Sequence, residues 1–212
     1  MNLTIMMSVP ASILAWLCVL YVDRPVSLYI HEHLYGNRYW AQLTSSLPDT
    51  LLVMVVVISA ASFIDYCFRK QKHVLDTHTL LMRHIALSVP ISYVVKVVLK
   101  ILFGRVETRY WLKHQHLYEF HWFHSCGNFS GFPSGHMIVF ATLFAAIARY
   151  HPPHSVLCHS LLGVLAILLV ATNYHFVGDV IYGAYIGFLT EWCMYRFCRW
   201  DTADETAGSG AT

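Results

Sequence analysis

The sequence predicts an all-α protein, an integral membrane bundle of about six transmembrane helices. Hydrophobic residues make up 57% of the 212 residues and charged residues only 12%, whereas a soluble domain carries roughly 25% charged residues. The mean hydropathy is positive. Apolar runs recur at lengths near the roughly 20 residues that a helix needs to cross a bilayer. These observations place the chain in the membrane class.

Six apolar segments are the expected spans. They cover residues 5–22, 51–67, 80–103, 136–150, 156–172 and 180–197. The fourth is short for a span. A shorter amphipathic segment at 26–34 is expected to lie along the membrane interface as a helix. We expect a single membrane domain over residues 1–200 and a disordered polar tail over residues 201–212.

The positive residues predict the orientation of these spans. Basic residues cluster after the second span, after the fourth span and at the C-terminal end, at Arg69, Lys70, Lys72, Arg149, Arg196 and Arg199. With six spans these regions share one side, which the positive-inside rule makes cytoplasmic. Segment 104–133 and the junction near His175 then share the opposite face. We expect a bacterial inner membrane, with this face toward the periplasm.

Composition also excludes several classes of protein. The net charge is +2, and the lysines and arginines are too scattered for a nucleic-acid surface. The six cysteines contain no CxxC pair, so we expect neither a disulfide framework nor a zinc site. The apolar run at 13–22 has no basic flank before it, which indicates a retained first span rather than a cleaved signal peptide. The sequence indicates no oligomeric state.

The first group of candidate functional residues is Lys100 and Arg105, at the end of the third apolar segment. A cation in this position is costly unless it is paired or functional. Lysine offers a point charge and arginine a planar fork to phosphate oxygens. Lys96 lies one turn earlier, and Arg109 follows within reach. Alternatively, Lys100 and Arg105 extend toward the lipid headgroups.

The second group is the run Gly131-Phe-Pro-Ser-Gly-His136, which leads directly into an apolar segment. Pro133 favours entry into a helix, and Ser134 is a good N-cap residue. Gly135 allows its backbone N–H to approach an anion at the helix N-terminus. His136 then stands where it could donate a proton to a leaving oxygen. The alternative is a turn-to-helix junction with an incidental histidine.

The third group is His175 and Asp179, four residues apart at the start of the last span. This spacing puts both on one helical face. The carboxylate can accept the imidazole N–H and orient the other ring nitrogen toward a substrate. The alternative is a structural pair that caps the helix. A buried carboxylate in an apolar span is expensive, however, which favours the functional reading.

The aromatic stretch 118–126 contains His121, His124 and Cys126. Their spacing fits no standard zinc pattern, and no second cluster completes a site. We therefore favour an amphipathic lid that dips into the headgroup region and shapes a lipid entrance.

In these motifs the chain resembles the type 2 phosphatidic acid phosphatase superfamily, whose motifs are Lys-x6-Arg-Pro, Pro-Ser-Gly-His and Ser-Arg-x5-His-x3-Asp. The second motif is complete at residues 133–136, and the third is present as His175-x3-Asp179. The first matches only as Lys100 with Arg105. Glu107 and Thr108 stand where Arg-Pro is expected, and leucines at 168 and 169 replace Ser-Arg.

The resemblance implies a lipid phosphatase that needs no metal and no cofactor and acts on a phosphorylated lipid. His175 would attack phosphorus, Asp179 would orient it, and His136 would protonate the leaving group. The phosphate would be held by Lys100, Arg105, Ser134 and Gly135, with Arg109 in place of a missing arginine. Two alternatives stay open: phosphotransfer to a lipid or sugar acceptor, as in sphingomyelin synthase-like enzymes, and a degenerate member that only binds lipid.

Overall fold

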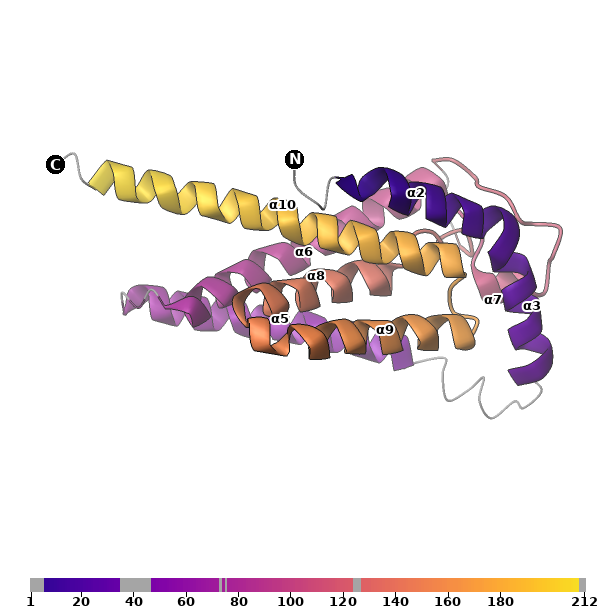
Figure 1. Ribbon diagram of the computed structural model, residues 1–212, viewed down its shortest axis with the longest axis horizontal. Coiled ribbons are helices and arrows are strands. Elements are labelled where there is room, and N and C mark those ends of the chain that lie inside the picture. Colours follow the sequence, from indigo (N-terminus) through magenta and orange to yellow (C-terminus); the bar gives the residue numbers. More distant parts are fainter. Residues whose placement is uncertain (1–5, 35–46, 73, 75, 124–126, 210–212) are drawn as a thin grey trace.

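The computed structural model describes residues 6–34, 47–72, 74, 76–123 and 127–209. Within these residues the regular structure is helical, apart from an isolated bridge between Arg105 and Phe120. In this part of the chain, five long helices run side by side along the longest dimension of the molecule (Figure 1). They are α5 (Leu47–Gln71), α6 (Thr77–Phe103), α8 (Gly135–Tyr150), α9 (Ser155–Ala171) and α10 (Val177–Ser209). The expected all-α membrane bundle is confirmed.

Helix α8 is the central element of the bundle. Its first nine residues, from Gly135 to Leu143, are all buried, and it packs against α6, α9 and α10. By contrast, α5 and α9 expose large apolar side chains such as Val57 and Ile167, as lipid-facing helices do. Gly183 and Gly187 let α10 approach α8 closely, because a Cβ at either position would lie within 2.6 Å of a backbone oxygen of the start of α8.

Among the described residues, four helical stretches are long and apolar enough to cross a membrane: Ser8–Leu34, Asp49–Gln71, Thr77–Phe103 and Pro152–Ala171. Helix α8 is a shorter apolar helix, which agrees with the short fourth span expected from the sequence. Each of the six expected spans falls on a helix. Helix α10 continues to Ser209, beyond residue 200, where we expected the polar tail to begin.

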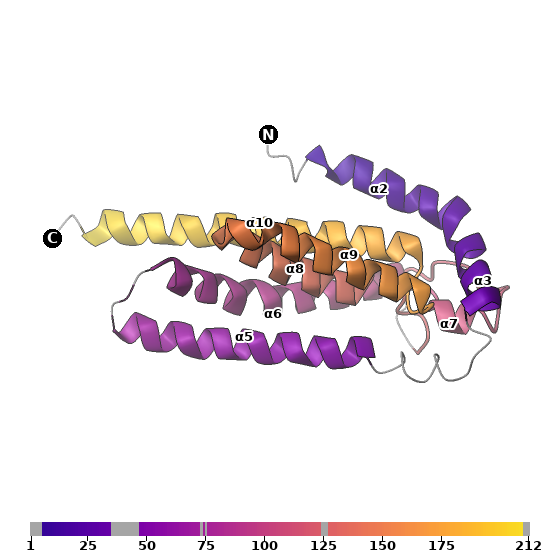
Figure 2. The same cartoon turned by 60° about the horizontal axis from the view of Figure 1, so that its bottom comes forward.

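The expected first span and interface helix form one continuous helical stretch. Helix α2 (Ser8–Leu17) passes through a π-helical turn (Cys18–Val22) into α3 (Asp23–Leu34). The stretch bends, so that α3 lies across one end of the bundle (Figure 2). The buried residues of α3 are Asp23, Ser27 and Ile30, whose spacing of four and three places them on one face. That face points toward the candidate site described below.

The other end of the bundle contains an ion cluster around the buried carboxylate of Glu191. Arg149 donates from Nε and Nη2 to the two carboxylate oxygens of Glu191, both at 2.6 Å. The Nε2 atom of His84 lies 3.3 Å from Glu191 Oε1. His84, Arg149 and Glu191 belong to α6, α8 and α10, so the cluster ties the three helices together. A bidentate arginine explains how a carboxylate is tolerated in this span.

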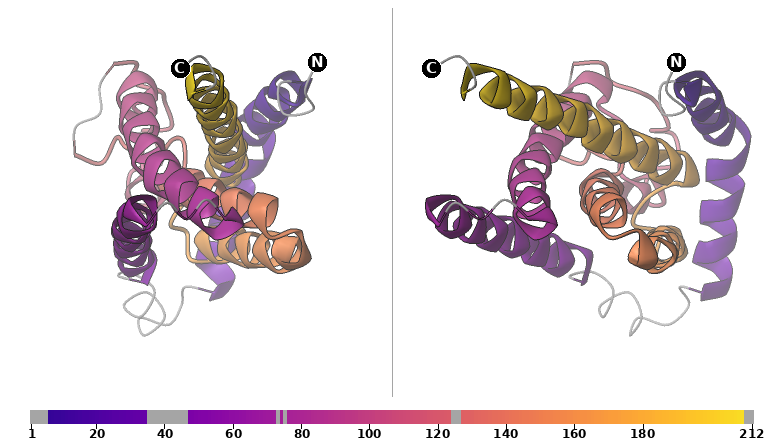
Figure 3. Two further views of the ribbon diagram at one scale, coloured as in Figure 1. Left: turned by 90° about the vertical axis from the view of Figure 1, so that its left-hand side faces the viewer. Right: turned by 60° about the vertical axis from the view of Figure 1, so that its left-hand side comes forward.

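Chain topology brings the predicted site segments to one end. The start of α5, the end of α6, the short α7 (Thr108–Trp111), the start of α8, the end of α9 and the start of α10 meet there, and α3 covers them. In the right-hand view of Figure 3, α8 lies between α6, α9 and α10, and α3 runs along one side. This agrees with the expectation that segment 104–133 and the junction near His175 share one face.

Candidate active site

A polar cavity of about 280 Å³ opens at this end of the bundle. Its walls come from α5, α6, α8, the segment that follows α6 and the turn between α9 and α10. The lining residues are Asp49, Leu52, Lys96, Lys100, Glu107, Arg109, Ser130, Gly135, His136, Tyr174 and His175. Five of the eight predicted site residues are among them: Lys100, Arg109, Gly135, His136 and His175. The other three, Arg105, Ser134 and Asp179, lie behind the wall.

His175 lies in the turn that joins α9 to α10. The backbone N–H groups of Tyr174 and His175 both donate to the carbonyl oxygen of Leu169, at 3.0 and 3.2 Å. This turn closes α9 and leaves the His175 ring against the cavity, with 5% of the residue exposed. The leucines at 168 and 169 bring no charge to this turn. Leu169 is buried in the core, and Leu168 is exposed.

Asp179 faces His175 from the first turn of α10. The His175 Nδ1 and Asp179 Oδ2 atoms are 3.7 Å apart, and the same oxygen accepts the N–H of Phe176 at 3.1 Å. Asp179 therefore caps the start of α10 and lies beside the imidazole at the same time. Its two possible roles, capping the helix and orienting His175, are compatible. Nδ1 therefore faces Asp179, and the His175 ring also lies within hydrogen-bond reach of the Gly131 backbone.

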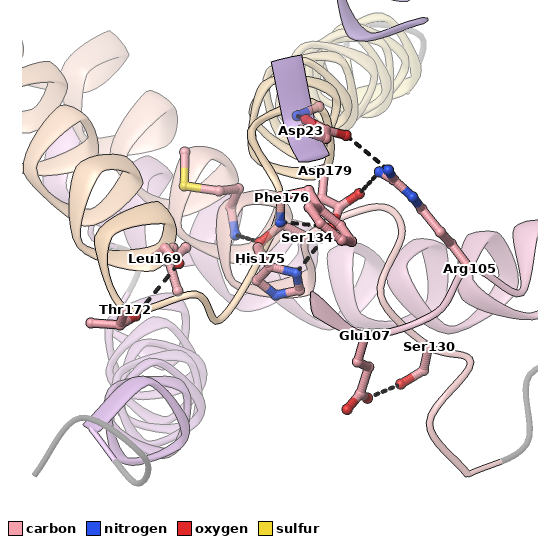
Figure 4. Close-up of polar contacts among 12 residues, drawn as sticks. Asp23, Arg105, Glu107, Ser130, Ser134, Leu169, Thr172, His175, Phe176 and Asp179 are labelled. Carbon is pink, nitrogen blue, oxygen red and sulfur yellow. Dashed lines mark hydrogen bonds and ion pairs between the residues drawn. The ribbon is translucent and has the colours of Figure 1, made fainter. Parts of the chain in front are cut away.

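Arg105 is placed differently from the sequence expectation. Only 1% of it is exposed, and it does not line the cavity. Its Nη1 donates to Asp179 Oδ1, and its Nη2 donates to Asp23 Oδ2 at 2.8 Å (Figure 4). Nη2 also donates to the Tyr118 hydroxyl at 2.6 Å. Burial alone would lower the Arg105 pKa, but the two carboxylates outweigh it and the pKa is raised. Arg105 is thus a partner of Asp179, not a wall residue available to phosphate.

Helix α3 holds both sides of the His175 turn. The Asp23 Oδ1 atom accepts the N–H of Gly178 at 2.8 Å. Ser27 Oγ donates to Asn173 Oδ1 at 2.9 Å, and Asn173 Nδ2 donates back to the Ser27 carbonyl oxygen at 3.2 Å. Sequence reasoning missed Asp23 and Ser27. The available signal was an aspartate inside a long apolar helical stretch, which is costly unless it has a partner.

The Pro-Ser-Gly-His segment forms the N-terminus of α8. Ser134 is its N-cap, accepting the N–H of Met137 at 3.4 Å, and its own N–H donates to the carbonyl oxygen of Asp179 at 3.0 Å. Ser134 is fully buried, so its hydroxyl serves the helix rather than the cavity. Gly135 and His136, the next two residues, line the cavity.

The two histidines of the motifs face the same cavity. The ring centroids of His136 and His175 are 5.8 Å apart, which is close enough for both to contact one phosphoryl group. His136 is 5% exposed, and neither of its ring nitrogens has a hydrogen-bond partner among the described residues. Asp49 Oδ1 lies 3.7 Å from His136 Nε2.

Three cations line the cavity: Lys96, Lys100 and Arg109. Arg109 Nη2 donates to the carbonyl oxygen of Thr172 at 3.2 Å, and its guanidinium lies 5.0 Å from the centre of the Tyr174 ring. These contacts hold Arg109 over the His175 turn. Lys96 packs along Gly135, where a Cβ would come within 2.6 Å of the lysine Cδ atom. The small residue therefore lets a second lysine reach the cavity.

Two carboxylates also line the cavity, and the sequence reasoning did not predict them as site residues. Asp49 accepts a hydrogen bond from the Tyr174 hydroxyl at 3.0 Å. Glu107 accepts one from Ser130 Oγ at 2.7 Å. Burial and the Asp49 contact raise the Tyr174 pKa to about 12, so this phenol stays protonated and continues to donate.

The electrostatic environment favours a neutral His175. This residue lies between the helices α9 and α10. Burial, followed by the charge of Lys100, lowers the pKa of His175 to about 3, although the Glu107 carboxylate opposes the shift. At neutral pH the ring is therefore uncharged, and the nitrogen that carries no hydrogen keeps its lone pair, as a nucleophile requires.

The described part of the aromatic stretch lies beside the ion pairs of Arg105. Tyr118 contacts Arg105, and His121 packs edge-on against Phe129 with centroids 4.5 Å apart. His124 and Cys126 lie outside the described residues. Trp122 and Phe123 are exposed, as the lid hypothesis requires. The described residues contain no group of three His, Cys, Asp or Glu side chains placed to hold a metal ion.

Comparison with known proteins identifies two similarities. The family model of the PAP2 superfamily matches residues 81–203. The structure is similar to the crystal structure of the first transmembrane PAP2 type phosphatidylglycerolphosphate phosphatase from Bacillus subtilis, with a TM-score of 0.60 and 19% sequence identity. The match covers 94% of this chain and 97% of the other. No curated protein sequence matches this chain.

Proposed function

The chain belongs to the PAP2 superfamily, and on that premise we propose that it is a membrane lipid phosphatase. The reaction is hydrolysis of a phosphomonoester or pyrophosphate of a lipid through a phosphohistidine. The observation that carries this proposal is the pair of histidine rings, 5.8 Å apart on one cavity, beside three cations. Such a cavity offers a nucleophile, a proton donor and charge stabilisation for one phosphoryl group.

In the first step the Nε2 lone pair of His175 attacks phosphorus. The bond from phosphorus to the leaving oxygen breaks, and protonated His136 gives its proton to that oxygen. Asp179 stabilises the positive charge that forms on His175, and the Lys100, Lys96 and Arg109 charges stabilise the phosphoryl oxygens. The products of this step are the lipid alcohol, or a lipid monophosphate from a pyrophosphate, and phosphohistidine.

In the second step water replaces the lipid. Neutral His136 takes a proton from the water as its oxygen attacks phosphorus, and the bond from phosphorus to Nε2 breaks. Inorganic phosphate leaves, His175 is again neutral, and His136 is again protonated. The low pKa of His175 supports this assignment, because the free residue then waits in its nucleophilic form.

Candidate substrates are phosphatidylglycerol phosphate, phosphatidate, undecaprenyl pyrophosphate and a phosphorylated lipid A. The first is also the substrate named for the similar Bacillus subtilis protein. We place the site at the periplasmic face of a bacterial inner membrane, supported by the basic residues at the opposite end. In a cysteine-free background, Glu119→Cys should react in whole cells with a thiol reagent that does not cross the inner membrane, and Lys72→Cys should not.

The test of this function is phosphate release from a panel of lipid phosphates in detergent, with a chelator present. His175→Ala should abolish turnover, and His136→Ala should reduce it by at least 100-fold, within the roughly 10²–10⁴-fold range of general acid–base catalysis. His116→Ala is the matched control, since His116 is exposed and does not line the cavity. Full activity in His175→Ala would disprove the nucleophile. Transfer of phosphate to an added alcohol without free phosphate would favour the phosphotransferase alternative.

A further inference from the structure

The cavity is lined by side chains of both charges. Three cations, Lys96, Lys100 and Arg109, face two carboxylates, Asp49 and Glu107. Leaving the histidines aside, these five side chains carry one net positive charge. A phosphomonoester dianion therefore meets repulsion from the carboxylates as well as attraction from the cations. A substrate that also carries a positive group would relieve this repulsion.

The position of Asp49 shows which part of a substrate it would meet. Its Oδ1 atom is 3.7 Å from His136 Nε2, and 66% of its side chain is exposed. In the proposed function, on which this inference rests, His136 protonates the leaving oxygen. Asp49 therefore lies on the side of the leaving alcohol, at the mouth of the cavity, rather than beside the phosphoryl oxygens.

The surroundings of Asp49 leave it available to a ligand. One oxygen accepts the Tyr174 hydroxyl, and within the described part of the chain its ion-pair contact is with His136 rather than with a lysine or arginine. His136 itself is more than nine-tenths buried, lines the same cavity and has no hydrogen-bond partner on either ring nitrogen within that part of the chain. Asp49 is thus largely open to solvent, and the adjacent His136 nitrogens lack the partners that a ligand would supply.

We propose that Asp49 recognises a protonated amine on the leaving alcohol, so that the preferred substrate is a lipid phosphomonoester with an ammonium group on the carbon next to the ester carbon. The amine would pair with the Asp49 carboxylate while the phosphate lies among the cations. Tyr174 positions the carboxylate by donating to it. A carboxylate that only supported the proton on His136 would change the turnover of all substrates alike, whereas amine recognition changes their ratio.

The test uses three synthetic lipids: hexadecyl phosphate, 2-aminohexadecyl phosphate and its N-acetyl derivative. The kcat/KM of the free amine should exceed that of the N-acetyl lipid by about fivefold at low salt, the size of a partly exposed ion pair. The ratio should shrink with added salt. Asp49→Asn should bring it close to one and raise the rate on hexadecyl phosphate. Glu119→Gln, which removes an exposed charge outside the cavity, should leave the ratio unchanged.

The outcomes separate this inference from the proposed function. Equal kcat/KM values for the amine and N-acetyl lipids, or a preference that persists in Asp49→Asn, would overturn amine recognition while phosphate release from hexadecyl phosphate still supported a lipid phosphatase. An equal loss on all three lipids in Asp49→Asn would also overturn it and assign Asp49 to His136. No phosphate release from any lipid phosphate would overturn both proposals.

Discussion

Replacing Asp23 with asparagine tests whether the first helical stretch positions the catalytic turn. The side chain keeps its size but loses its charge. Arg105 then retains one carboxylate, Asp179, instead of two. Asp23 now accepts hydrogen bonds from both Arg105 Nη2 and the N–H of Gly178. Asparagine has only one acceptor oxygen, so its NH₂ group would face one of these two donors and that hydrogen bond would be lost.

Burial determines the expected magnitude. The side chains of Asp23 and Arg105 are 0% and 2% exposed, so solvent does not replace the lost contact. Removing one partner from a buried ion pair costs about 3–5 kcal/mol. We expect the lower end, since Asp179 remains. A loss of about 3 kcal/mol lowers the melting temperature of a chain of this size by roughly 6–12 °C.

Activity should fall as well, because Gly178 follows His175 by three residues. A misplacement of about 1 Å at a reacting group costs up to roughly 100-fold in rate. We expect kcat to fall between about tenfold and 100-fold, with KM changed little, because Asp23 does not line the cavity. The assay is steady-state phosphate release, at a temperature where the variant is folded, with thermal unfolding in detergent measured in parallel.

Glu32→Gln is the matched control, because Glu32 is an exposed acid on the same helix. It should change neither kcat nor the melting temperature. In a double-mutant cycle, Asp23→Asn and Arg105→Gln together should cost less than the sum of the single losses, by about 0.5–3 kcal/mol. If Asp23→Asn matched the control in both measurements, the argument that α3 positions the His175 turn would be refuted.

Three further predictions concern other parts of the structure. Arg149→Ala leaves Glu191 buried without its bidentate partner and should cost about 3 kcal/mol of stability, seen as a lower melting temperature with unchanged kcat. The pKa of His175 is lowered from 6.5 to about 3. The stability that depends on its neutral form is therefore fully present above pH 6.5 and is lost as the pH falls toward 3. Across this window the stability of His175→Asn should decrease less steeply with acid than that of the parent. Gly183→Ala should cut activity more than tenfold, because its Cβ would lie 2.6 Å from the carbonyl oxygen of Ser134, which precedes the cavity residues Gly135 and His136. By contrast, Gly163→Ala, in open space, should stabilise the chain by about 0.4–1 kcal/mol.

The amino-acid sequence by itself determined the membrane class, the helical spans and the principal site segments. Each depends on local chemistry. Apolar runs of bilayer length require helices, because backbone groups have no other partners in lipid. A Ser-Gly-His sequence before an apolar run predicts an N-cap, and the spacing of His175 and Asp179 puts both on one helical face. The positive residues alone predicted that segment 104–133 and the junction near His175 lie on one side of the bundle.

Tertiary structure decided which charged groups meet. Arg105 looked like a phosphate ligand in the sequence, but it is held by Asp179 and by Asp23, which is 82 residues away. Ser27 and Asn173 are 146 residues apart, and Asp49 reaches the cavity from the start of another helix. No local pattern encodes these pairs, because they depend on how the helices cross and on where the first helical stretch bends. Burial then determines whether a charge binds substrate or another side chain, and that is settled only when the bundle is packed.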